Sequence, residues 1–151
     1  MTKTSLRASN NPYKKKGSII GLEQGKIPPQ AVELEEAVLG ALMIDKNALN
    51  EVIDILESEC FYKDSHREIY STIKTLFTES QPIDMLTVST MLRKNGKLEL
   101  CGGDFGIANL TQKVASSAHI EYHARIIVQK HIQRSLIRVS SEIIHDAYEE
   151  S

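Results

Sequence analysis

Tryptophan is absent from the chain, aromatic residues make up only 5% of it, and cysteine occurs twice. So few aromatic side chains leave few platforms on which single-stranded nucleic acid can stack. Cys60 and Cys101 stand far apart and fit no metal-ligand spacing, so we expect reduced thiols in a cytosolic protein. No apolar run approaches the roughly 18 residues that span a bilayer, and the amino terminus shows no secretion signal. We therefore expect a soluble, cytoplasmic protein.

A surplus of positive charge is also missing, because the formal net charge is −2. Residues 1–27 hold six basic residues and one acid, whereas residues 28–151 hold 12 basic and 19 acidic residues. A surface that follows the phosphates of nucleic acid needs clustered positive charge. We therefore expect little direct binding of nucleic acid by the chain after residue 27.

The composition divides the chain into three parts. Residues 1–27 are rich in Ser, Asn, Lys and Gly without hydrophobic periodicity, which predicts a disordered basic tail. Within it, GLEQGKI (21–27) is similar to a phosphate-binding loop, but Ile27 stands where Ser or Thr must reach magnesium, and no strand precedes it. Residues 28–114 are predicted to form a helical head, and residues 115–151 a long arm.

Apolar residues recur at helical spacing after the two prolines at 28 and 29, and no segment alternates for long enough to predict a strand. We therefore predict an all-α fold, with a small globular helical head plus a long C-terminal helix or helical hairpin. Helices are expected at 30–44, at 46–57, from within 60–73 to residue 78, at 87–95 and at 104–114. In the third helix, the residues expected to face inward are Ile69, Tyr70, Ile73, Leu76 and Phe77.

The segment CFYKDSHREIYSTI (60–73) places a histidine beside tyrosine, serine and acids, as small active sites often do. Ser65 and Glu68 match the S-x-x-E capping box, in which each side chain bonds the other residue's amide at a helix start. Phe61 and Tyr62 are expected to pack over that start, with His66 in the first turn. A general base would need an orienting partner and a substrate pocket, and the sequence indicates neither. We interpret these five residues as a structural helix start.

No other pattern predicts a catalytic, cofactor-binding or metal site. His119 and His123 are four residues apart, a spacing that can present two imidazoles to one metal, but no third ligand is evident. The glycines of CGGDFG (101–106) predict a turn between helices, and Asp84 predicts a helix cap. The residues alone thus indicate a non-catalytic interaction module.

The last segment is unusual, since residues 117–150 contain neither glycine nor proline. An unbroken helix here would be on the order of 45–50 Å long, more than the head can cover. The surplus must pack on a partner helix, either from another subunit or, if the helix is kinked, folded back within one monomer. We predict self-association through an apolar stripe and its neighbours: Ile120, Ala124, Ile127, Val128, His131, Ile132, Leu136 and Val139.

Five segments, in order, resemble those of one family, the amino-terminal domain of the bacterial replicative DNA helicase DnaB. They are PPQAVELEEAVLGALM (28–43), FYKDSHREIYSTIKTL (61–76), PIDMLTVSTMLRKNGKLE (82–99), GGDFGIANL (102–110) and SSAHIEYHARIIVQKHIQRSLI (116–137). Each segment alone is a pattern of helix caps and apolar stripes, but their succession is specific. The chain departs from the family at three places, where Gly106 replaces a frequent tyrosine, Ala115 a frequent proline and His119 a frequent asparagine.

The resemblance implies a helical head and a helical hairpin that pairs with a second copy, with three such dimers forming a collar on a hexameric ring. It also implies that the collar docks the carboxyl-terminal domain of primase, leaves room for a helicase loader, and acts at the nucleoid-associated replication fork in the bacterial cytoplasm. ATP and Mg²⁺ are expected only for the ATPase domain, which this sequence lacks. The chain itself is therefore expected to bind no cofactor and not to be an enzyme.

Three alternatives stay open at this point. The helicase-interaction domain of a primase has a related head and hairpin, and would be the partner rather than the helicase. A helical DNA-binding regulator would bind duplex DNA tightly and with strong salt dependence. An unrecognised enzyme would lose its activity on His66→Ala substitution while keeping its fold.

Overall fold

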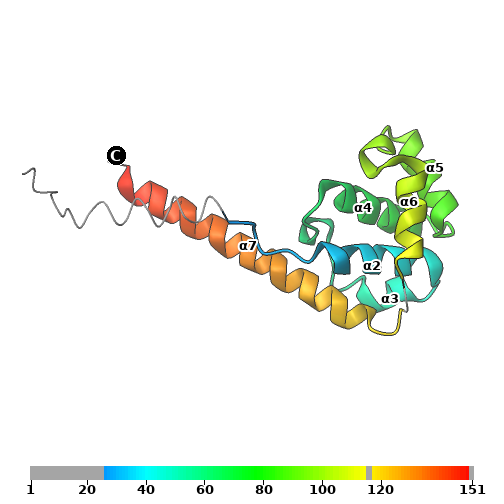
Figure 1. Ribbon diagram of the computed structural model, residues 1–151, viewed down its shortest axis with the longest axis horizontal. Coiled ribbons are helices and arrows are strands. Elements are labelled where there is room, and N and C mark those ends of the chain that lie inside the picture. The colour runs from blue at the N-terminus through cyan, green and yellow to red at the C-terminus, as the bar shows by residue number, and fades with distance from the viewer. Residues whose placement is uncertain (1–25, 115–116, 150–151) are drawn as a thin grey trace, which may run out of the picture.

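The computed structural model describes residues 26–114 and 117–149, and all of its elements are helical (Figure 1). They are α2 (Val32–Ile44), α3 (Ala48–Val52), the 3-10 helix η1 (Ser58–Cys60), α4 (Asp64–Thr78), α5 (Met85–Lys94), the 3-10 helix η2 (Glu99–Cys101), α6 (Gly103–Gln112) and α7 (Ile120–Tyr148). No strand occurs in these two ranges, in agreement with the predicted all-α class. Residues 1–25 of the tail predicted for residues 1–27 lie outside the described residues, and so does Ala115.

Helix α2 lies at the centre of the head and contacts α4, α6 and α7 (Figure 1). Its second half is buried on all sides, which explains why its apolar residues run together from Val38 to Met43 instead of forming a narrow stripe. The contact with α6 is so close that a Cβ atom on Gly40 would lie 2.2 Å from the backbone oxygen of Leu110. Glycine at this position therefore lets the two helices cross.

Helix α4 buries four of the five residues predicted to face inward, namely Ile69, Tyr70, Ile73 and Leu76. The prediction was wrong for Phe77, which is 43% exposed because it lies in the last turn, one residue before the helix ends. The second predicted helix is also shorter than expected. Regular α3 ends at Val52, and the chain then turns so that the carbonyl of Leu56 accepts a hydrogen bond from the Tyr70 hydroxyl at 2.9 Å.

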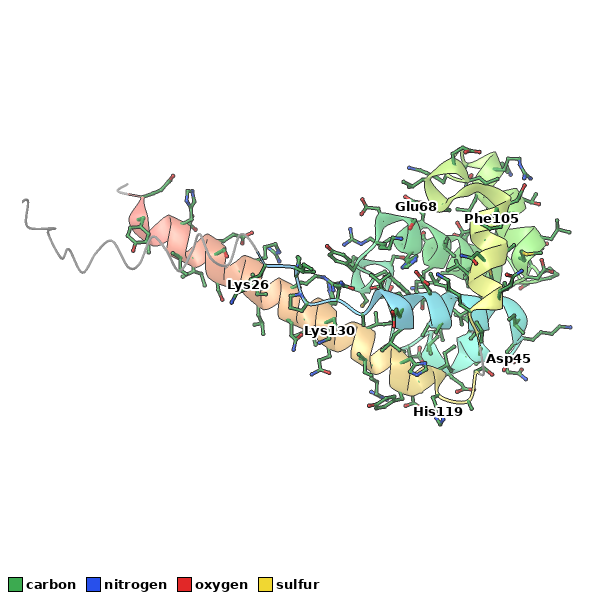
Figure 2. The ribbon with its side chains drawn as sticks, in the orientation of Figure 1. Lys26, Asp45, Glu68, Phe105, His119 and Lys130 are labelled. Atoms are coloured by element: carbon green, nitrogen blue, oxygen red, sulfur yellow. The ribbon has the colours of Figure 1, made fainter. Side chains whose placement is uncertain are left out.

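Of the two loop predictions in the other half of the head, the helix cap is confirmed and the glycine turn is confirmed in part. Asp84 caps α5, because its carboxylate accepts the amide of Thr87 at 2.8 Å while its own amide donates to the Thr87 hydroxyl. The turn predicted for 101–106 is shorter: it lies at Gly102 between η2 and α6, and residues 103–106 already belong to α6. Gly102 and Gly103 both have positive φ angles, which glycine adopts without strain. Within α6, Ile107 is buried and Phe105 is 81% exposed at the surface of the head (Figure 2).

The last predicted segment forms one uninterrupted helix, α7, of 29 residues. At 1.5 Å per residue its length is about 43 Å. Its first part packs against α2, α3 and η1, and the rest projects from the head as a rod (Figure 1). The alternative of a kinked helix that folds back within one monomer is therefore wrong for the described residues. The folded head also extends past the predicted boundary at residue 114, since it includes the first turns of α7.

Candidate interaction site: the neck and the exposed arm

The first turns of α7 belong to the core of the head. Ile120, Ala124 and Ile127 are 2%, 0% and 1% exposed, and Val128 packs partly buried against the same core. His119, at the turn that leads into the helix, occupies the N-cap position without a side-chain hydrogen bond to the first turn (Figure 2). The asparagine that is frequent in the resembling family would supply such a bond.

The apolar stripe of α7 winds around the helix. Successive residues of an α-helix are about 100° apart, so a stripe that steps by four residues rotates by about 40° at each step. From Ile120 to Leu136 the stripe takes four such steps and turns through about 160°. It therefore begins on the side that faces the head and ends on the opposite side, where Leu136 is 61% exposed.

We call residues 136–149 the exposed arm, because every residue in this range is exposed. It carries six large apolar side chains that are between 39% and 66% exposed, namely Leu136, Ile137, Val139, Ile143, Ile144 and Tyr148. Three of these residues line a groove of about 680 Å³ between α7 and the segment Lys26–Pro29. An uncovered apolar surface of this extent is typical of a protein–protein contact.

The structure separates the eight residues predicted for self-association into two groups. The prediction was wrong for Ile120, Ala124 and Ile127, because they are buried in the core of their own chain. Val128 and His131 are partly covered, whereas Ile132, Leu136 and Val139 are between 41% and 61% exposed. For these five residues, self-association stays a prediction.

Arg134 fixes the direction in which α7 leaves the head, and we call it and its contacts the neck. Its guanidinium donates to the carbonyl oxygen of Pro29 at 2.8 Å and to that of Cys60 at 2.9 Å, and it lies 5.4 Å from the centre of the Tyr62 ring. Partial burial lowers the pKa of Arg134. The planar fork of arginine can bond two carbonyls from separate segments at once, which a lysine ammonium does less well.

The start of α4 is held by Glu35 of α2 and not by the predicted capping box. The helix begins two residues earlier than that motif requires, at Asp64, and the preceding Lys63 gives no side-chain cap. Instead, the two carboxylate oxygens of Glu35 contact His66 Nδ1 and the backbone amide of Tyr62, each at 2.8 Å. Glu68 instead lies 3.7 Å from Lys97 in a surface ion pair.

The other structural role predicted for this segment agrees with the geometry. Phe61 is fully buried, and its ring centre lies 5.1 Å from that of Tyr70. His66 is 3% exposed and Glu35 is 1% exposed, so His66 does have an orienting partner, but the pair is closed off from solvent. We therefore interpret it as a buried polar contact that joins α2 to α4.

Sequence reasoning missed the roles of Glu35 and Arg134. A signal for Glu35 was present, because it stands at helical spacing with Val38, Leu39 and Leu42 and hence on the buried face of α2. An acid on that face needs a partner, since burying an unpaired charge is costly. No comparable signal marked Arg134, whose partners are carbonyl groups distant in the sequence.

The candidate metal pair stays without a third ligand. The ring centres of His119 and His123 are 6.5 Å apart, and Glu121 pairs with Arg125 instead. Across residues 26–114 and 117–149, no group of three or more His, Cys, Asp or Glu residues is placed to hold a metal ion. In the same ranges no helix is both long and apolar enough to cross a membrane.

Comparisons with known proteins show which family has this architecture. The profile of a family described as "DnaB-like helicase N terminal domain" matches residues 27–129. The replicative DNA helicase DnaB of Rhodothermus marinus is 43% identical over 127 residues, which are 84% of this chain and 13% of that helicase. The chain thus spans a small part of that relative's length.

Two solved structures are similar to the chain. The N-terminal domain of DnaB helicase from Mycobacterium tuberculosis matches with a TM-score of 0.80 at 29% identity, over 82% of this chain and 90% of that one. A structure of a DnaB-like replicative helicase and its interactions with primase matches with a TM-score of 0.65 at 26% identity, over 75% of this chain and 26% of that one.

These matches confirm the resemblance seen in the sequence and the predicted fold of a helical head with a long C-terminal helix. They lie on the amino-terminal domain of the helicase, outside its ATPase domain, and they favour neither a primase domain nor a DNA-binding regulator. The chain belongs to the family of DnaB-like helicase N-terminal domains.

Proposed function

We propose that this chain is the non-catalytic collar domain of a hexameric replicative DNA helicase, and that its exposed arm joins copies of the chain during assembly. The observation that carries the proposal is the exposed arm itself. A helical segment of a few turns that packs on nothing has little stability in water. A helix that carries six exposed apolar side chains is therefore expected to bury them on a partner.

A second copy is the partner that this face fits best. Leu136, Val139 and Ile143 follow each other at spacings of three and four residues, the pattern by which two helices pack side by side. Pairs of copies would then build the ring as a trimer of dimers. In this role the chain would bind no cofactor, and ATP and Mg²⁺ would act only in an ATPase domain of the helicase.

Primase is the further partner that we propose, through its carboxyl-terminal domain. Support comes from the similarity to a helicase whose structure is described together with its interactions with primase. The collar would then position primase at the replication fork in the bacterial cytoplasm, next to the nucleoid, while a helicase loader binds the same ring. Direct contact of this domain with nucleic acid would be slight, because residues 28–151 carry a net charge of −7.

Sedimentation of Leu136→Asp and Ile143→Asp variants tests the self-association. We expect the unchanged chain to dimerise as its concentration rises and each variant to stay monomeric, because a buried carboxylate without a partner opposes the contact. Ser141→Asp is the matched control, since it adds the same charge to the arm about 140° around the helix from Leu136. A chain that stays monomeric at millimolar concentration, or variants that dimerise as well as the control, would contradict the proposal.

A further inference from the structure

A second feature of the neck is polar and not apolar. A cleft of about 540 Å³ opens where α7 leaves the head, between η1, the first turn of α4 and α7, and we call it the neck cleft. Its lining consists of polar side chains only: Ser58, Glu59, Arg67, His131, Arg134, Ser135 and Arg138. Three arginines and a histidine thus face one acid. The chemistry of this cleft suits an anionic ligand.

The cleft adjoins the apolar groove beside the exposed arm, because Arg134 and Arg138 line both. Arg134 and Arg138 each stand two residues from Leu136, which places them about 160° around α7 from it. They continue the side of the helix that faces the head. The cleft proposal therefore concerns this polar side of α7, and the self-association proposed above concerns the side of Leu136.

The charge of Arg134 has no carboxylate partner in the described part of the chain. Its two hydrogen bonds go to carbonyl oxygens, which hold the guanidinium in place without neutralising it. Partial burial lowers the pKa of Arg134, the carboxylate of Glu35 opposes this change, and the positive charge of Arg67 adds to it. A bound anion would relieve this repulsion without moving the guanidinium, so the site is organised in advance.

The charges of the other two arginines are paired only at the surface, although Arg67 Nε also donates to the carbonyl oxygen of Phe61 at 2.7 Å. Arg67 pairs with Asp64 at 3.2 Å and Arg138 pairs with Glu142 at 3.0 Å, and all four side chains are at least 44% exposed. Ion pairs between exposed side chains contribute little to stability. Exchange of these carboxylates for those of a ligand therefore costs little free energy.

We propose that the neck cleft binds the carboxylates of an acidic segment in a partner protein, held between Arg67, Arg134 and Arg138. Arginine forks match carboxylates with two parallel hydrogen bonds. A nucleic-acid backbone fits less well, because it needs a track of positive charge, whereas this cleft is a single basic hollow in a part of the chain with a net charge of −7.

His131 supplies a local probe of the cleft. Partial burial lowers the pKa of His131. The positive charges of Arg134 and Arg67 lower the same pKa further, whereas the negative charge of Glu59 raises it. Carboxylates bound beside the ring would raise this pKa. Since the bound state then takes up a proton, affinity is expected to rise as the pH falls from 7.5 to 5.5, while the glutamates of the ligand stay ionised.

The experiment follows the His131 imidazole resonances of the 151-residue chain while a blocked hexaglutamate peptide is added at low salt. We expect the midpoint of the His131 titration to move to higher pH, and a hexaglutamine peptide to leave it unchanged. This readout reports on the cleft and not on the basic residues 1–27. Binding is expected to weaken as salt is added.

Matched variants decide whether the cleft is the site. Arg67→Gln and Arg138→Gln are each expected to weaken binding about fivefold, whereas Glu59→Gln removes the only acid of the lining and is expected to tighten it about threefold. Arg125→Gln is the control, because Arg125 also forms an i,i+4 ion pair on α7 but lies outside the cleft. An unmoved His131 resonance, a Glu59→Gln variant that binds no tighter, or a larger response to duplex DNA than to hexaglutamate would overturn the proposal.

Discussion

Single charged residues hold two of the long-range polar contacts in this molecule. Glu35 joins α2 to the start of α4 through His66 and the amide of Tyr62, and Arg134 joins α7 to Pro29 and Cys60. Both side chains bond two groups at once, and both partners of Glu35 lie in the segment that the sequence marks as a helix start. These particular polar groups are thus satisfied by residues distant in sequence.

Substitution of Glu35→Ala is expected to destabilise the head by about 3 kcal/mol, because it leaves His66 and the Tyr62 amide buried without an acceptor. Urea unfolding followed by circular dichroism measures the change in the free energy of unfolding. Glu33→Ala is the matched control, since Glu33 lies on the same helix and is exposed, and it should change stability by less than about 0.5 kcal/mol. Equal effects of the two substitutions would show that the buried contact contributes nothing.

The prediction of a Ser65–Glu68 capping box failed at this same residue scale. The pattern S-x-x-E is local, and the sequence around it is compatible with a cap. The residue that holds this helix start is Glu35, which stands 31 residues before His66 in the sequence. A four-residue pattern cannot indicate a partner so far away. Asp84 shows the contrast, because its cap involves only Thr87, three residues later, and the sequence predicts it correctly.

At the scale of helices, apolar spacing predicts which residues form each helix more reliably than it predicts which part of a helix is buried. The spacing located α2, α4, α5, α6 and α7, because each of them buries residues three and four apart. It placed Ile120 and Leu136 on one stripe, although the winding of that stripe sends the first into the core and the second to the surface. Helix α7 was therefore predictable as a helix, but its division into a buried and an exposed part was not.

Substitution of Gly40→Ala tests the crossing of α2 and α6. The added methyl group would lie 2.2 Å from the Leu110 oxygen and 2.3 Å from a methyl carbon of Val114, so the helices must move apart. We expect a loss of about 2 kcal/mol in the free energy of unfolding, measured in urea. Adding Val114→Ala should recover little, because the backbone oxygen stays in place. Stability equal to that of the unchanged chain would mean that α6 can shift freely.

At the scale of the whole molecule, α7 is one helix in two environments. Its first turns share the core of the head, and the neck ends that contact at Arg134. Beyond this point the exposed arm projects from the head, with its own backbone hydrogen bonds and local side-chain pairs such as Arg138–Glu142 to keep it helical (Figure 1). A single continuous element thus links the folded head to a surface that is expected to meet other chains.

Amide hydrogen exchange should therefore divide α7 into two parts. At low micromolar concentration we expect the amides of residues 120–131 to exchange only through unfolding of the head, and those of 136–148 to exchange much faster, through local fraying. Raising the concentration should slow exchange in the exposed arm, where a second copy would cover it, and leave residues 120–131 unchanged. If the exposed arm is as protected as the first turns at the lowest concentration, a contact within the monomer must cover it. If its exchange is fast at every concentration, the apolar face of the arm does not join two copies of this chain.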